Sequence, residues 1–96
     1  MIPCNIIWDL EDDPDGNVQH IAEHGISMED VEDVLSNPNN STTTSSSRGR
    51  SVTFGETLDG RYLAVVWETA LEDPLTIYPV TAYEAPRPRG RPRGRK

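Results

Sequence analysis

Apolar and polar positions follow two different periods along this chain, a helical one in the first half and an alternating one in the second. Over residues 17–23 and again over 28–35, apolar side chains recur three and four positions apart, which predicts two short amphipathic helices. Ser27 stands where the second helix needs an N-cap, and Gly25 stands where the first needs a left-handed residue after its end. From Ser51 the period changes to two, which predicts strands.

Four segments have the apolar, β-branched character of strands. They are residues 5–9, 51–54, 62–67 and 75–83. The run at 62–67 is the most strand-like and is expected at the centre of the sheet, after a hairpin turn at Asp59 and Gly60. Pro79 predicts a bulge or an edge position, because proline removes one ladder donor. The order β-α-α-β-β-β predicts an α+β domain, with two helices packed on one face of a small antiparallel sheet.

The segment between the helices and the strands has a different composition. Residues 36–47 contain no apolar side chain and therefore cannot offset the entropy of ordering, so we expect a mobile loop that runs on to Arg50. The folded domain is expected to cover residues 1–86, and residues 87–96 are expected to form a disordered basic tail.

Charge divides the chain at the same boundary. Residues 1–86 hold all 16 acidic side chains and carry −13, whereas residues 87–96 carry +6, which together give the net charge of −7. The acidic runs at 9–15 and 29–33 are expected to form a solvated face for a cationic partner. A calcium loop starting at Asp9 would need a glutamate at its twelfth position, where His20 stands, so no metal or cofactor is expected.

Cysteine content and hydropathy indicate the cellular compartment in which the protein is expected. The single cysteine, Cys4, excludes a disulfide within the chain and suits a reducing cytosol. The first residues lack a basic start, and no apolar run approaches the roughly 20 residues of a membrane helix. We therefore expect a cytoplasmic protein without a signal peptide and without a membrane partner.

Several segments, in order and spacing, resemble the BrnT family. They are I-I-W-D at 6–9, N at 17, H-I-A-E-H-G-I at 20–26, E-D-V-L at 32–35 and F-G-E-T-L-D-G-R-Y-L-A-V-V at 54–66. BrnT-like proteins are toxins of type II toxin–antitoxin pairs, related in fold to RelE ribonucleases. The resemblance, which runs over roughly residues 5–84, implies an RNA endonuclease that is neutralised by an antitoxin that also binds operator DNA.

The resemblance also implies candidate catalytic residues. RelE-type cleavage uses the 2′-hydroxyl of the RNA as nucleophile, and guanidinium groups stabilise the charge on the phosphate. Arg61 matches the family's hairpin arginine, and Arg48 and Arg50 flank the expected loop. The alternative for Arg61 is an ion pair with Asp59 or Glu56 that only stabilises the hairpin.

Histidines and tyrosines supply further candidates. His20 and His24 stand four residues apart on the first helix, so His24 is a candidate general base and the pair a candidate metal site. The alternative is that one histidine caps the helix while the other packs beside the core. Tyr78 and Tyr83 face opposite sides of the last strand, so at most one of them belongs to a shared site on the sheet.

Two departures from the family pattern support a second hypothesis. BrnT-like chains carry S-A-R-x-A on the last strand, but the matching residues 80–85 contain no arginine. The acidic domain also repels phosphate over about 8–10 Å at physiological salt. On this second hypothesis, the chain is a non-catalytic nucleic-acid-binding module of the same fold.

The tail R-P-R-G-R-P-R-G-R-K resembles an AT-hook, whose centre is R-G-R-P. Proline and glycine keep such a segment thin and extended, so its arginines can enter the narrow minor groove of AT-rich DNA. Binding of RNA by an R-G segment and a merely solubilising tail are the alternatives. The candidate nucleic-acid-binding residues are Arg87, Arg89, Gly90, Arg91, Pro92, Arg93, Arg95 and Lys96.

Overall fold

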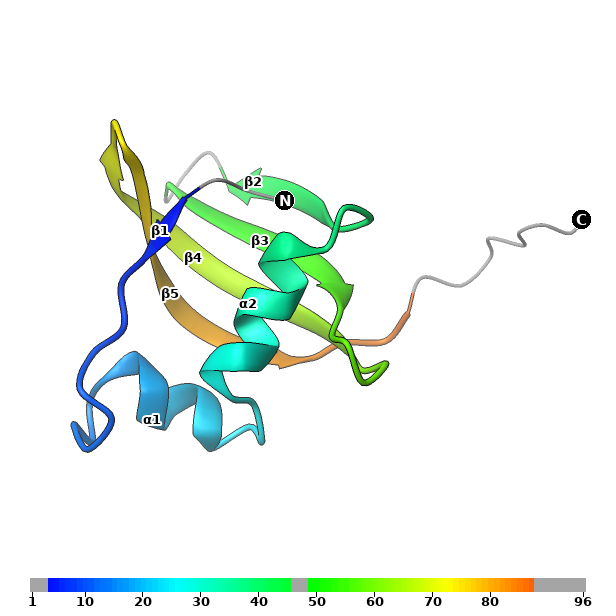
Figure 1. Cartoon of the computed structure of the whole chain (residues 1–96), viewed down its shortest axis with the longest axis horizontal. Helices are drawn as coiled ribbons and strands as arrows, with labels where there is room; N and C mark the ends of the chain where they lie inside the picture. The colour runs from blue at the N-terminus through cyan, green and yellow to red at the C-terminus, as the bar shows by residue number, and fades with distance from the viewer. Residues whose placement is uncertain (1–3, 46–48, 88–96) are drawn as a thin grey trace, which may run out of the picture.

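One mixed sheet of five strands, partly covered by two helices, makes up the fold (Figure 1). The computed structural model describes residues 4–45 and 49–87. The strands lie in the order β1-β5-β4-β3-β2. The elements are β1 (Asn5–Ile6), α1 (Asn17–Ala22), α2 (Met28–Ser36), β2 (Ser41–Ser45), β3 (Arg50–Glu56), β4 (Tyr62–Glu72) and β5 (Leu75–Glu84). The prediction of an α+β domain is therefore confirmed.

Strand direction and number differ from the prediction. Strands β2 to β5 form an antiparallel ladder, but β1 pairs with β5 in parallel, with Asn5 opposite Thr76 and Ile6 opposite Ile77. The expected purely antiparallel sheet is therefore wrong at this edge. Local sequence gives no sign of this direction, because the paired residues are separated by almost the whole domain.

Strand β2 lies where the sequence predicts a loop. Residues 41–45 pair along their whole length with Arg50–Phe54 of β3. Hydroxyl groups replace apolar contacts between the strands, since the Oγ1 atoms of Thr42 and Thr53 lie 2.8 Å apart. The prediction of a loop over 36–50 is wrong for residues 41–45, and the order β-α-α-β-β-β lacks this strand. Side-chain and backbone hydrogen bonds supply the pairing that burial supplies elsewhere.

The long β4–β5 hairpin contains the predicted irregularity. The register shifts between Val66 and Trp67, which brings Trp67 opposite Pro79. Proline has no N–H to donate, so the ladder is interrupted at this point. Of the two alternatives at Pro79, a bulge or an edge position, the structure has the bulge. The shift places Tyr78 opposite Glu68 and Tyr83 opposite Ala64, which lie on the same face of β4, so the prediction that the two tyrosines face opposite sides is wrong.

Helix α2 begins at the predicted N-cap, and the predicted left-handed glycine follows the end of α1. Ser27 accepts a hydrogen bond from the Asp30 amide, and the Asp30 carboxylate accepts one from the Ser27 amide, which forms a capping box. Gly25 has a φ of 76°, the left-handed value that a side chain would disfavour. The junction between α1 and α2 is thus fixed by its own residues.

The positions of the helices differ from the prediction. Helix α2 crosses the sheet face over β3 and β4, whereas α1 lies beside β5 at the margin of the sheet (Figure 1). Ile21 is the only apolar side chain that the short α1 buries fully, so this helix covers little of the sheet. Neither described helix is long and apolar enough to cross a membrane.

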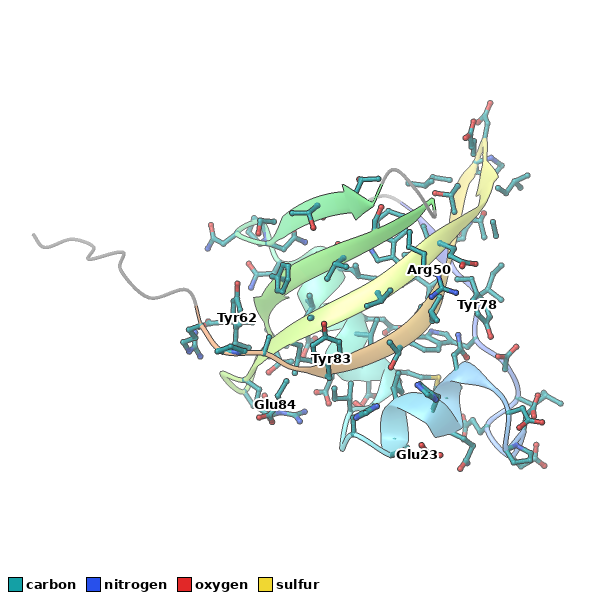
Figure 2. All side chains as sticks on the ribbon, turned by 180° about the vertical axis from the view of Figure 1, so that it is seen from behind. Glu23, Arg50, Tyr62, Tyr78, Tyr83 and Glu84 are labelled. Carbon is teal, nitrogen blue, oxygen red and sulfur yellow. The ribbon has the colours of Figure 1, made fainter. Side chains whose placement is uncertain are left out.

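The core lies between the helices and the sheet. Its buried side chains are Ile21, Ile26, Val31, Val34, Leu35, Leu63, Val65, Ile77 and Ala82. Seen from behind, the strands lie in front of α2, so the other face of β3, β4 and β5 is open (Figure 2). The fold therefore presents one sheet face that neither described helix crosses.

Candidate functional site

Aromatic side chains line the open face of the sheet. Thr53, Val65 and Ala82 are buried on the helix side, so their neighbours along each strand point to the opposite side. The residues brought together there by pairing are Val52, Phe54, Tyr62, Ala64, Val66, Thr81 and Tyr83. The rings of Phe54 and Tyr62 are stacked with their centroids 6.4 Å apart, and Tyr83 is 40% exposed (Figure 2).

Arginines stand at both ends of this face, each beside a glutamate. At one end, Arg50 Nε lies 2.7 Å from Glu68 Oε2, and both side chains are nearly half exposed. At the other end, the guanidinium carbon of Arg87 lies 5.6 Å from the centroid of the Tyr62 ring, and Arg87 also pairs with Glu56. Rings with guanidinium groups at their margins are the combination that holds unstacked bases and phosphates.

The second cluster surrounds Arg61, at the start of β4. Its Nη2 pairs with Asp30, Nη1 donates to the Gly25 carbonyl at 3.0 Å, and two further carboxylates lie at 3.7 Å. Those carboxylates belong to Asp59 and Glu84. Arg61 therefore ties the α1–α2 junction to the β3–β4 turn and to the end of β5.

The charges of this cluster support one another. The hydrogen bond to Asp30 raises the pKa of Arg61. Burial works to raise the pKa of Asp30, but hydrogen bonds from Ser27 and Arg61 outweigh it and lower the pKa. The hydrogen bond from Thr57 likewise lowers the pKa of Asp59. Arg61 pairs with Asp59, one of the two carboxylates considered from sequence, whereas Glu56 pairs with Arg87.

The three candidate catalytic residues do not form one group. His24 is exposed and directly precedes Gly25, so it lies at the same end of the molecule as Arg61. Arg50 begins β3, about 20 Å from Glu56 at the end of that strand. The rings of His20 and His24 lie 5.6 Å apart, but residues 4–45 and 49–87 contain no group of three side chains that could hold a metal ion.

A polar network centred on the buried Asn17 joins the segment that follows β1 to α1 and β5. Asn17 is 2% exposed, and its amide nitrogen donates to the carbonyls of Ile7 and Pro79, both at 3.0 Å. Its Oδ1 accepts from the Asp9 amide at 2.9 Å, and the Asp9 carboxylate accepts from the Tyr78 hydroxyl at 2.6 Å. Sequence reasoning missed this network, although Asp9 and Asn17 stand in segments that carry the family resemblance.

The network gives stability a pH dependence at both extremes. The hydrogen bond to Asp9 raises the pKa of Tyr78 from 10.0 to about 12, and the same bond lowers the pKa of Asp9. The Tyr78 contribution is therefore complete below pH 10 and is lost as the pH rises to about 12. The Asp9 contribution is present above the ordinary carboxyl range and is lost as the pH falls through its lowered pKa.

Tyr78→Phe is expected to flatten both limbs of the stability profile, because it removes the bond that links the two groups. The measurement is the free energy of unfolding against pH, compared with Tyr83→Phe, whose hydroxyl stands on the open face. Equal pH profiles for wild type and Tyr78→Phe would contradict the assignment.

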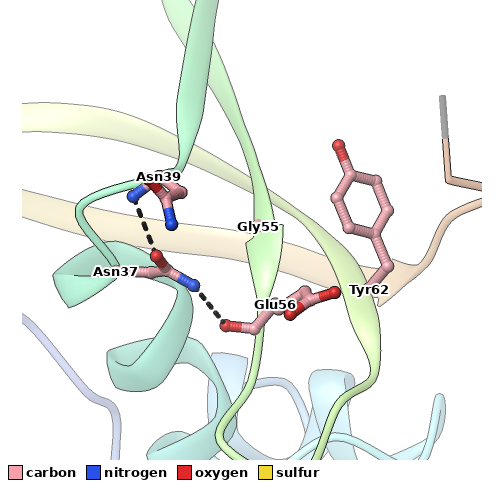
Figure 3. Close-up of a pocket in the computed structure, with 5 residues that line it drawn as sticks. All are labelled: Asn37, Asn39, Gly55, Glu56 and Tyr62. Carbon is pink, nitrogen blue, oxygen red and sulfur yellow. Dashed lines mark hydrogen bonds between the residues drawn. The ribbon is translucent and has the colours of Figure 1, made fainter. Parts of the chain in front are cut away.

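A groove lies between the end of α2 and the β3–β4 hairpin. One hollow of about 280 Å³ is lined by Asn37, Asn39, Gly55, Glu56 and Tyr62 (Figure 3). A second of about 440 Å³ is lined by Asp33, Ser36, Asn37, Pro38, Glu56 and Leu58. Asn37 and Glu56 line both, so the two hollows adjoin.

The remaining candidate residues lie outside the described residues. These are Arg48, Arg89, Gly90, Arg91, Pro92, Arg93, Arg95 and Lys96. Of the basic tail, only Arg87 is described, and it contacts Glu56, Gly60 and Tyr62. A scan against protein-family models and a search of curated proteins found no match for this chain.

Proposed function

We propose that this chain is a BrnT-like member of a toxin–antitoxin pair and that it binds single-stranded RNA on its open sheet face. The observation that carries the proposal is the uncovered face itself, with Phe54, Tyr62 and Tyr83 between Arg50 and Arg87. Stacking on aromatic rings tolerates any base, since every base has a π-face. The resemblance in the hairpin and helix-junction segments supports the family.

In this proposal the 2′-hydroxyl of the RNA attacks the adjacent phosphorus, the bond from phosphorus to the 5′-oxygen of the next nucleotide breaks, and water gives a proton to that oxygen. His24 is the candidate to take the proton of the 2′-hydroxyl, because it is exposed and directly precedes Gly25, whose carbonyl accepts from Arg61. Arg61 or Arg50 would stabilise charge on the phosphate, and each would first have to exchange a carboxylate partner for it. A partner with a basic segment would neutralise the protein by covering its acidic surface. We propose that both proteins act in the cytoplasm.

Tyr83→Ala is expected to weaken binding of single-stranded RNA by about tenfold, within the range of about 1–3 kcal/mol per stacked base. The measurement is fluorescence anisotropy with a labelled oligonucleotide. Leu71→Ala is the control, since Leu71 is 53% exposed on β4, outside the cluster of paired aromatic residues. Equal losses in both variants would exclude the aromatic face as the binding surface.

The second candidate function is a non-catalytic nucleic-acid-binding module that its basic tail tethers to AT-rich DNA. The observation that favours it is the engagement of Arg61 by three carboxylates, which leaves its charge already neutralised. If the six basic side chains of residues 87–96 each contact a phosphate, the slope of log K against log salt would be about −5.

Induced expression separates the two candidates. A ribonuclease toxin is expected to arrest growth and fragment RNA, and His24→Gln is expected to abolish both without unfolding the exposed helix end. His20→Gln is the matched control, because its ring lies 5.6 Å from that of His24. His20 stands on α1, whereas His24 follows the end of that helix at Ala22, so the prediction that both histidines lie on the first helix is wrong for His24. Normal growth and intact RNA with wild type would favour the non-catalytic module.

A further inference from the structure

The groove beside the β3–β4 hairpin already holds one guanidinium group on its wall. Arg87 pairs with Glu56, donates to the Gly60 carbonyl at 2.6 Å and lies over the Tyr62 ring at 5.6 Å. A carboxylate, a carbonyl and an aromatic face are the three groups that recognise arginine. The same Glu56 and Tyr62 line the smaller hollow (Figure 3).

The larger hollow offers complementary chemistry. Asp33 adds a second carboxylate, and its Oδ2 accepts from the Leu58 amide at 3.1 Å, which holds the side chain at the groove. Pro38 and Leu58 provide apolar surface, and Leu58 is 91% exposed. Acidic groups beside apolar and aromatic surface suit an extended segment in which arginine alternates with proline or glycine.

We propose that this groove binds the chain's own residues 88–96, with arginine side chains paired to Asp33 and Glu56. The described chain ends at Arg87, which is already seated at the groove's edge. Residues 88–96 hold five of the nine basic side chains and no acid, whereas the remainder is strongly acidic. Docking in this way hides the tail from nucleic acid until a stronger polyanion displaces it.

Chain length permits this arrangement. An extended segment rises about 3.1 Å per residue, so Arg89 and Arg91 lie within about 6 and about 12 Å of Arg87 along the chain. Glu56, the partner of Arg87, lines both hollows and Asp33 lines the larger one, so the segment starts beside the groove that we propose it enters. Docking of residues 88–96 in the groove involves no RNA. It can therefore be correct whether or not the open sheet face binds RNA.

Zero-length carbodiimide cross-linking tests the docking directly in the full chain. Lys96 is the only lysine, so the double substitution Arg91→Lys and Lys96→Arg moves the reactive amine into the segment without changing its charge. Peptide mass mapping is expected to join position 91 to Asp33 or Glu56 at least fivefold more often than to any carboxylate of residues 9–15. Products spread evenly over the acidic side chains, or products between two isotope-labelled copies, would overturn the proposal.

Affinity for AT-rich duplex DNA gives an independent readout. Asp33→Asn with Glu56→Gln is expected to tighten full-chain binding at least fivefold relative to Glu11→Gln with Asp12→Asn, which removes the same charge from an exposed turn. Equal affinities of the two double variants would show that the groove does not hold the tail.

Discussion

Asn17→Ala is expected to lower the free energy of unfolding by about 3 kcal/mol, because it leaves one buried and two partly buried backbone groups without their partner. Asn17 is 2% exposed and bonds to the Ile7 carbonyl, the Pro79 carbonyl and the Asp9 amide. Each of these groups would have to lose its hydrogen bond or admit water. The measurement is urea denaturation followed by tryptophan fluorescence, since Trp8 packs against the same core.

Gln19→Ala is the matched control for Asn17. Gln19 lies on the same helix and also donates to a backbone carbonyl, that of Glu11 at 2.6 Å, but this bond is exposed. A surface change of this kind is expected to alter stability by less than about 0.5 kcal/mol. Similar losses in the two variants would contradict the special contribution of the Asn17 network, since alanine is the best helix former and neither substitution weakens the helix by propensity.

Arg61→Ala is expected to cost about 2 kcal/mol, because it frees the partly buried Asp30 from its charged partner. The loss also removes the contact between Gly25 and the hairpin, so the α1–α2 junction should open before the sheet does. Native-state hydrogen exchange at the amides of α2 measures this directly. A role confined to catalysis would instead leave stability and exchange unchanged.

Arg50→Ala is the control for Arg61. Its ion pair with Glu68 is nearly half exposed at both side chains, and such pairs contribute about 0–1 kcal/mol.

The coupling between Arg61 and Asp30 can be measured separately. The double change Arg61→Ala with Asp30→Ala should be less destabilising than the sum of the single changes. Additive losses would show that Arg61 and Asp30 do not act on each other.

Local signals predicted local structure in this chain. Ser27 and Gly25 act within one or two turns of helix, so the capping box and the left-handed end could be inferred from their neighbours. Pro79 likewise predicted its bulge, because the missing N–H is a property of that residue alone. The alternating period predicted three of the four antiparallel strands, because alternation is visible within each strand alone.

Features that depend on distant residues could not be inferred. Asn17 has the sequence context of an ordinary first helix residue, and only the pairing with the Pro79 carbonyl, 62 positions later in β5, makes it a buried connection between elements. Arg61 could be paired with nearby Asp59 from sequence, but not with Asp30 from the α2 capping box. The open aromatic face required the register of β3, β4 and β5, which the alternating pattern alone leaves undetermined.

The hydroxyl-rich composition of β2 has a consequence for how the sheet moves. Its Ser and Thr side chains are exposed at residues 41–44, so a slip of two positions against β3 would bury and expose nothing new. Only backbone pairing and bonds such as that between Thr42 and Thr53 oppose such a slip. Strand β2 should therefore fray and re-pair on its own, while the other four strands keep one alignment.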